Sequence, residues 1–173
     1  MNRKIAITGL VIFALVSMGV GCTNNNQTKN SESVSFEGQS SQDYVWAEQG
    51  IKFKYPTGLV VIKGQRDILS FFPASTSQAD ITTALETIGS LTALSFRQNT
   101  TVDAQVQRFG KDLKSHAVEK INNRNFTKIE VNNGFTGNVD TFYFLPFKNG
   151  VLTYKADQYS SGNALLTLSS LEF

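Results

Sequence analysis

The residue with the clearest chemistry is Cys22, the single cysteine of the 173-residue chain. It follows an uncharged, mostly apolar run from Ile5 to Val20, which is itself preceded by two basic residues. A basic start, an apolar run of this length and small residues at its end are typical of a secretory signal peptide, whereas a membrane-spanning helix needs about 20 apolar residues. We therefore expect residues 1–21 to be an export signal that is cleaved between Gly21 and Cys22.

The residues around this cleavage point resemble a bacterial lipoprotein signal. Val20, Gly21 and Cys22 fit the lipobox of that family, and Gly19 stands where Leu is usual. The resemblance implies that the Cys22 thiol is acylated, as with palmitate, and becomes the mature N-terminus. Because two or more acyl chains anchor a protein stably, we expect a lipid-anchored, extracytoplasmic protein of the cell membrane or outer membrane. The alternative is a plain secretory signal that leaves a free thiol.

Patterns for catalysis or metal binding are absent from the sequence. His116 is the only histidine, and Asp140, Asp157 and Glu172 are isolated carboxylates. The chain contains no Gly-x-Ser-x-Gly elbow, P-loop, dinucleotide fingerprint or His-Glu-x-x-His motif. We expect no enzyme, no cofactor and no metal site. A hydrolase with two acids that meet only in space is the least favoured alternative.

The charge balance bears on the partners. The chain has 16 basic and 14 acidic residues, and removal of Arg3 and Lys4 with the leader leaves 14 of each. Binding to nucleic acid needs a clustered excess of Lys and Arg, so we expect no nucleic-acid partner. The balanced mature domain is expected to be a monomer.

The densest chemical feature is a late set of aromatic residues. Two interpretations stay open, because alternate residues of a hairpin face either the core or the solvent. In the first, the rings are core packing. In the second, Tyr143, Tyr154 and Tyr159 face outward and form a binding surface for a protein partner in the cell envelope. A small-ligand carrier with an apolar cleft is the alternative function. The set comprises Phe142, Tyr143, Phe144, Phe147, Tyr154 and Tyr159.

The elements that must position these residues follow from local patterns. Residues 22–43 are polar and predict a flexible tether, and residues 44–173 are long enough for one core. The apolar spacing of Val106 and Phe109 predicts a helix over Thr101–Ser115, with His116 favouring the dipole at its end. A last helix is expected after Ser160 or Ser161. Strands are expected at Gly50–Pro56, Gly58–Lys63, Ile68–Phe72, Leu91–Arg97, Asn125–Val131, Asp140–Phe147 and Val151–Ala156, and Ile81–Ile88 is ambiguous.

The last two strands are expected to form a hairpin across Lys148-Asn149-Gly150, with Gly150 at positive φ. Within strand Asp140–Phe147, the run from Phe142 to Phe147 is almost continuously apolar, which predicts a central strand covered on both faces. Strands followed by a helix, a meander and a closing helix indicate an α+β fold, an antiparallel sheet with helices packed on it.

Both ends of the globular part resemble PsbP-like domains, a family that includes an extrinsic photosystem II subunit and many bacterial lipoproteins. The tail Ser170-Leu171-Glu172-Phe173 and the aromatic hairpin Phe142–Tyr154 match the order of that family. The resemblance implies an α-β-α sandwich and a non-enzymatic role in binding or assembling other proteins. The opening motif consists of Tyr44, Trp46, Gly50, Phe53, Tyr55 and Pro56.

Overall fold

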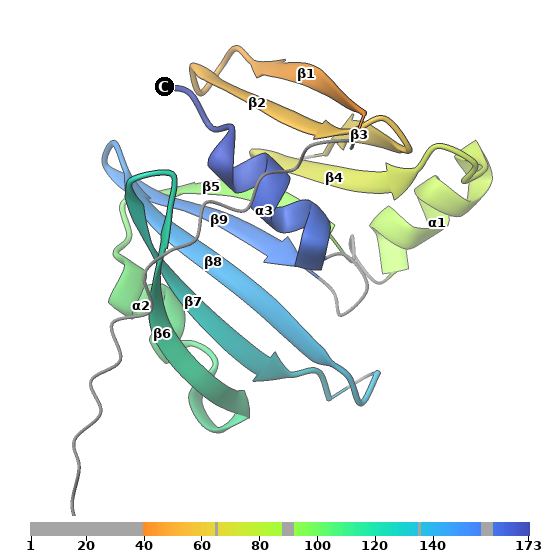
Figure 1. The fold of residues 1–173 in the computed structure, drawn as a ribbon. Helices are drawn as coiled ribbons and strands as arrows, with labels where there is room; N and C mark the ends of the chain where they lie inside the picture. The colour runs from red at the N-terminus through yellow and green to blue at the C-terminus, as the bar shows by residue number, and fades with distance from the viewer. Residues whose placement is uncertain (1–39, 65, 88–91, 135, 157–160) are drawn as a thin grey trace, which may run out of the picture. The chain divides into compact units, whose positions relative to one another are not determined.

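The computed structural model describes residues 40–64, 66–87, 92–134, 136–156 and 161–173. Seven strands form one antiparallel sheet in the order β3-β4-β5-β9-β8-β7-β6, and β1 pairs with β2 in a separate hairpin (Figure 1). The α+β class and the antiparallel sheet predicted from the sequence are confirmed. The elements are β1 Ser41–Trp46, β2 Ile51–Pro56, β3 Leu59–Lys63, β4 Ile68–Pro73, α1 Gln78–Thr87, β5 Thr92–Gln98, α2 Val102–Gln107, the 3-10 turn η1 Gly110–Asp112, β6 Leu113–Ile121, β7 Arg124–Asn132, β8 Val139–Phe147, β9 Gly150–Ala156 and α3 Ser161–Ser169.

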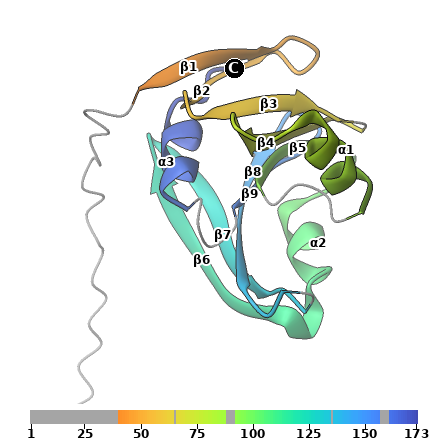
Figure 2. The same ribbon diagram turned by 90° about the vertical axis from the view of Figure 1, so that its right-hand side faces the viewer.

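The two faces of the large sheet are covered by different elements. Figure 2 shows α3 on one side of the sheet, and α1 and α2 on the other. The β1–β2 hairpin packs over α3, so Trp46 and Phe53 of the hairpin and Leu168 of α3 share one buried core. A second, smaller cluster joins Val106 of α2 to Phe144 of β8. Helices therefore cover both faces of the sheet.

Strand β8 contributes to both cores, as its continuous apolar sequence predicts. Tyr143 and Leu145 belong to the core beneath α3. Phe144 belongs to the core beneath α2, and the partly buried Phe142 packs against it. The alternation follows from the period of two along a strand, which sends successive side chains to opposite faces.

The helix predicted for Thr101–Ser115 is wrong in length. Helix α2 covers only Val102–Gln107, and Thr101 caps its start by accepting a hydrogen bond from the Ala104 amide at 3.2 Å. The helix ends at its C-cap Arg108, and Gly110, with φ of 48°, begins the 3-10 turn η1. Strand β6 starts directly after η1, so Lys114, Ser115 and His116 lie in a strand.

The tether predicted for residues 22–43 overlaps the fold by three residues. Ser41, Gln42 and Asp43 belong to β1 and pair with Pro56, Tyr55 and Lys54 of β2. The sequence did not predict the start of this strand, because Ser41–Asp43 are polar and exposed. The signal peptide, Cys22 and the rest of the tether lie outside the described residues.

The end of the chain is fastened to the hairpin. The Lys52 amide donates to the Glu172 carbonyl at 3.0 Å, and the Glu172 amide donates to the Lys52 carbonyl at 2.8 Å. Phe173 lies against Phe147, with the ring centroids 4.5 Å apart. Ala164, Leu168 and Leu171 are buried, and Leu165 is partly buried against the same core. The proposed cap at Ser160 lies outside the described residues.

The β8–β9 hairpin is confirmed, but the reason given for Gly150 is wrong. Lys148, not Gly150, carries the positive φ, at 50°. Gly150 is needed because β5 approaches it closely. A Cβ at this position would lie 2.1 Å from the Arg97 carbonyl oxygen and 2.9 Å from the Gln98 Cα. Only glycine allows this strand to pair so closely with β5.

We therefore predict that Gly150→Ala lowers the free energy of unfolding by about 2 kcal/mol or more, because the methyl group must push β9 away from β5. Gly58→Ala is the matched control, since a Cβ there meets nothing within 4 Å. It should change stability by less than about 0.5 kcal/mol. Urea unfolding of the full chain measures both values, and equal effects of the two substitutions would contradict the close approach.

Candidate functional site

Two of the three tyrosines of the predicted binding surface, Tyr143 and Tyr154, are buried. Tyr143 and Tyr154 are paired across β8 and β9, but their exposed fractions are only 3% and 1%. Their side chains point to the face that α3 and the β1–β2 hairpin cover, where Tyr154 contacts Phe71 with centroids 5.8 Å apart. The prediction that they line a solvent-facing site is wrong, because that face of the sheet is the larger core. Tyr159 lies outside the described residues.

An ion pair between Lys128 and Glu119 lies over Tyr143 at the edge of this core. The Lys128 ammonium lies 5.6 Å from the Tyr143 ring centroid and 3.2 Å from a Glu119 carboxylate oxygen. Burial raises the pKa of the Tyr143 hydroxyl, and the Glu119 charge adds to this effect. Burial by itself would lower the pKa of Lys128, but the Tyr143 and Glu119 oxygens outweigh it, so that the pKa is raised. Lys128 and Glu119 thus cover the edge of the core at Tyr143.

No cluster of three or more His, Cys, Asp or Glu residues suited to a metal ion occurs among the described residues. His116 is exposed on β6, so its predicted place at the end of a helix is wrong. Asp140 is bound to Lys155 at 3.2 Å and accepts a hydrogen bond from Asn133. Within the same part of the chain, no helix is both long and apolar enough to cross a membrane.

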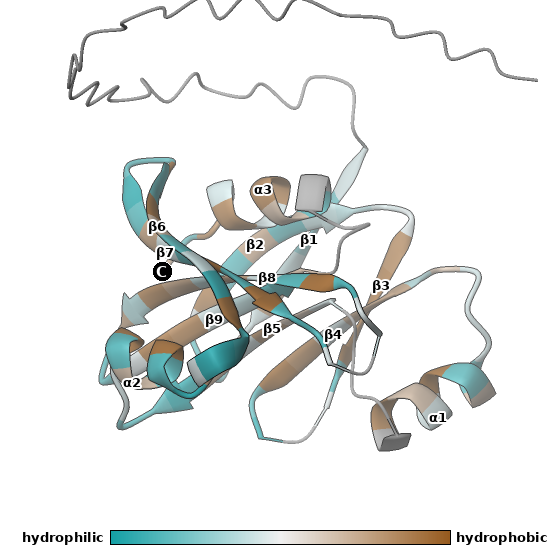
Figure 3. Cartoon of the chain, turned by 90° about the horizontal axis from the view of Figure 1, so that it is seen from below, coloured by the Kyte–Doolittle hydropathy of each residue, from teal (hydrophilic) through white to brown (hydrophobic). Residues whose placement is uncertain are grey.

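The largest unpartnered backbone feature is the free edge of β6. This strand is nine residues long, stands last in the strand order and pairs only with β7 among the described strands. Most of its side chains are exposed, and Val118 in its middle is 70% exposed. In Figure 3 the strand is largely hydrophilic, whereas α3 is mostly hydrophobic. An open edge of this length is a ready template for another strand.

The turn that follows β6 sets which backbone groups face this edge. Asn122 and Asn123 have φ of 43° and 62°, as in a two-residue type I′ hairpin, and Ile121 lies opposite Arg124. In such a hairpin the closing pair is hydrogen-bonded, and bonded and non-bonded pairs then alternate along the strands. The N–H and C=O groups of His116, Val118 and Lys120 therefore point away from β7.

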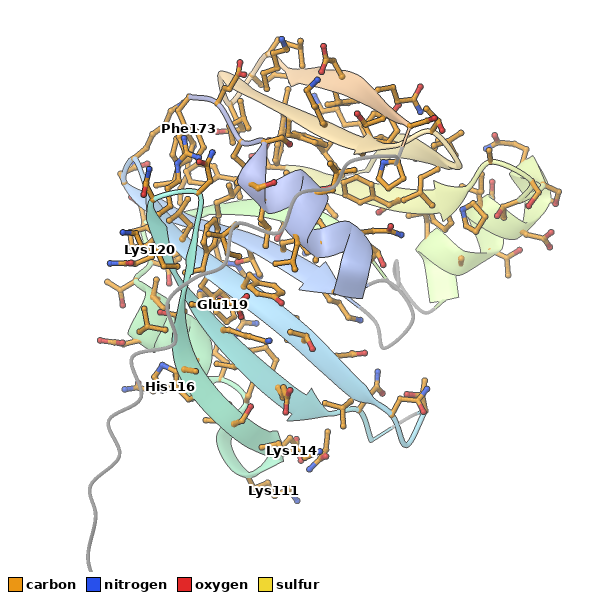
Figure 4. The ribbon with its side chains drawn as sticks, viewed as in Figure 1. Lys111, Lys114, His116, Glu119, Lys120 and Phe173 are labelled. Atoms are coloured by element: carbon orange, nitrogen blue, oxygen red, sulfur yellow. The ribbon has the colours of Figure 1, made fainter. Side chains whose placement is uncertain are left out.

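The side chains along the edge carry positive charge. Figure 4 shows Lys114, His116, Glu119 and Lys120 along β6 and Lys111 just before it. Glu119 is engaged by Lys128, which leaves the lysines as the dominant charges of the strand. The central segment from Ser115 to Val118 contains no Lys, Arg, Asp or Glu. Such a centre between lysines admits a strand and favours an acidic one.

The opposite edge of the sheet is less accessible. β3 has only five residues, and the Gln42 amide of β1 donates to its Leu59 carbonyl at 3.1 Å. The free edge of β6 was missed from the sequence because the predicted helix extended to Ser115 and no element was predicted for the residues between His116 and Asn125. The Asn122-Asn123 pair between Ile121 and Phe126 is the signal that predicts the hairpin.

No protein-family model and no curated protein matches this chain. A crystal structure from Bacteroides thetaiotaomicron aligns with a TM-score of 0.44 and 11% identity, over 76% of this chain and 47% of that one, so the chain spans about half its length. The solution structure of the cyanobacterial PsbP from Synechocystis aligns with a TM-score of 0.45 and 12% identity, over 82% of this chain and 98% of that one. No functional conclusion follows from either likeness.

The orientation of the edge predicts a period-two pattern of amide exchange in β6. The amides of His116, Val118 and Lys120 should exchange with solvent at least about tenfold faster than those of Ala117 and Glu119, which bond to β7. Hydrogen exchange followed by NMR on the full chain measures the rates residue by residue. Uniform protection along β6, or the opposite phase, would contradict the assigned orientation.

Proposed function

We propose that the chain is an extracytoplasmic lipid-anchored protein that binds, rather than transforms, a protein of the cell envelope. The partner contributes an extended acidic segment, which adds as a further strand on β6. The supporting observation is the nine-residue free edge of that strand. Addition of a strand supplies affinity through main-chain hydrogen bonds, and the flanking side chains supply selectivity.

The charges on the edge favour an acidic segment over a second copy of the chain. Two β6 edges brought together would place Lys114 and Lys120 of each copy near one another, and like charges across a strand pair are destabilising. An acidic strand instead meets opposite charges at both ends. The lysines thus allow a heterologous partner while keeping the protein monomeric.

The anchor and tether support this role. Cys22 is the expected lipidation site, and the described fold begins near Ser40. The polar composition between them predicts a flexible tether, and such a tether would span roughly 25 Å and keep the domain near the membrane without a fixed orientation. A tethered domain with a free strand edge can reach segments of neighbouring membrane proteins.

A labelled hexapeptide, Glu-Val-Glu-Val-Glu-Val with blocked ends, tests the strand addition by fluorescence anisotropy. Saturable binding to the full chain is expected, and the same peptide with Lys in place of Glu should not bind. Lys120→Glu should weaken binding about tenfold, whereas Lys54→Glu on β2 should leave it unchanged. Absence of binding, or equal binding of both peptides, would refute the proposal.

Two substitutions at one position separate the backbone from the side chain. Val118→Pro removes an N–H that faces the free edge and does not bond to β7, so the hairpin should remain intact. Peptide affinity should fall about tenfold or more. Val118→Thr keeps both the N–H and the branched shape, and should bind within about twofold of the parent. If Thr weakens binding as much as Pro, the interaction depends on the side chain and not on strand addition.

The anchoring is tested separately. Cys22→Ala should abolish incorporation of labelled palmitate and shift the protein from the membrane fraction, or leave an uncleaved precursor. Cys22→Ser serves as the conservative companion and should behave in the same way, because its hydroxyl does not replace the thiol. Unchanged fractionation and labelling of both variants would show that Cys22 is not lipidated.

A further inference from the structure

A cleft of about 290 Å³ opens on the face of the sheet that α2 covers. Its floor crosses three neighbouring strands, because Thr153 of β9 lies opposite both Ser95 of β5 and Phe144 of β8. Gln105 of α2 and the residues just after that helix form the opposite wall. The lining residues are Ser95, Arg97, Gln105, Arg108, Phe109, Phe142, Phe144 and Thr153.

Two arginines, Arg97 and Arg108, line this cleft, and no Asp or Glu does. Arg108 donates to the Gln105 side-chain oxygen at 3.2 Å, and the Gln105 amide donates to Thr100 at 2.8 Å. These two hydrogen bonds orient the Arg108 side chain and use only one of the five N–H donors of its guanidinium group. Among the described residues, neither Arg97 nor Arg108 forms a salt bridge. The charges at the cleft are therefore free for an external anion.

The remainder of the lining is aromatic. The Phe109 ring lies 4.8 Å from Phe142 and 6.5 Å from Phe144, and the Phe142 and Phe144 rings are stacked 6.1 Å apart. Phe109 and Phe142 are only partly buried, so their rings remain available to a ligand. Ser95 of β5 and Thr153 of β9 add two hydroxyl-bearing residues to the lining. The cleft thus combines an apolar surface with two arginines and two hydroxyl donors.

We propose that this cleft binds a small carboxylate that carries an aromatic body. Arg97 and Arg108 hold the carboxylate by charge-assisted hydrogen bonds, and the ring of the ligand packs against Phe109 and Phe142. The volume of about 290 Å³ sets the size of the ligand to about that of a single substituted ring. This site lies apart from the backbone edge of β6 and does not depend on the strand addition proposed above.

Phenylacetate is the probe, with the full chain held in lipid nanodiscs and binding followed by NMR of the phenylalanine rings and guanidinium groups. Saturable shifts of Phe109, Phe142, Arg97 and Arg108 are expected. Phenylacetamide, which has the same shape without the charge, and acetate, which lacks the ring, should each bind at least about tenfold more weakly. Inorganic phosphate distinguishes a general anion site, and tighter binding of phosphate than of phenylacetate would overturn the proposal.

The double variant Arg97→Gln/Arg108→Gln should lose phenylacetate affinity about tenfold or more, with an unchanged melting temperature. Lys54→Gln, which removes a unit charge from the β1–β2 hairpin, is the control and should bind like the parent. Phenylacetate partitions into the nanodisc lipid equally for the parent and the variants, so this uptake does not affect the comparison of their affinities. No saturable shift up to about 10 mM, equal binding of acid and amide, or unchanged affinity of the double variant would each refute the site.

Discussion

The pairing of β5 with β9 is the interaction on which the rest of the large sheet depends. Among the described strands, it alone joins the meander β3-β4-β5 to the meander β9-β8-β7-β6. The junction is tight at one end, where Gly150 lies against the backbone of Arg97 and the Asn99 amide donates to the Asn149 carbonyl. This contact places the side chains of β5 beside those of β9 and β8, and so determines both the main core and the cleft beneath α2.

The two faces of that sheet are covered to different extents. One face is closed by α3 and the β1–β2 hairpin, which bury Trp46, Phe53 and Tyr154 almost completely. The other receives the six residues of α2 with η1 and, farther along, α1. Because α2 ends before Gly110, it covers Phe144 but leaves Ser95 and Thr153 partly exposed. After η1 the chain forms β6, so the early end of α2 accounts for both the cleft and the free edge.

Much of the fold could be predicted from local patterns. The alternation in Ile51–Pro56 and the apolar runs ended by proline or glycine correctly predicted β2, β4 and the β8–β9 hairpin, since period-two patterns and turn residues act over a few positions. The helix over Thr101–Ser115 failed because Val106, Phe109 and Leu113 fit a helical face, whereas the backbone turns at Gly110. The first half of β1, Ser41–Asp43, is polar and gave no apolar pattern.

The sequence by itself predicted most of the strands, the closing helix, the Lys148-Asn149-Gly150 turn and a lipidated Cys22. Tertiary structure decided that Tyr143 and Tyr154 are core residues, that β6 is the free edge and that Arg97 and Arg108 share a cleft. Alternation shows which side chains of a strand share a face, but not which face is covered. That depends on pairing between segments far apart in the chain, as between β5 and β9, and on where α3 and α2 pack.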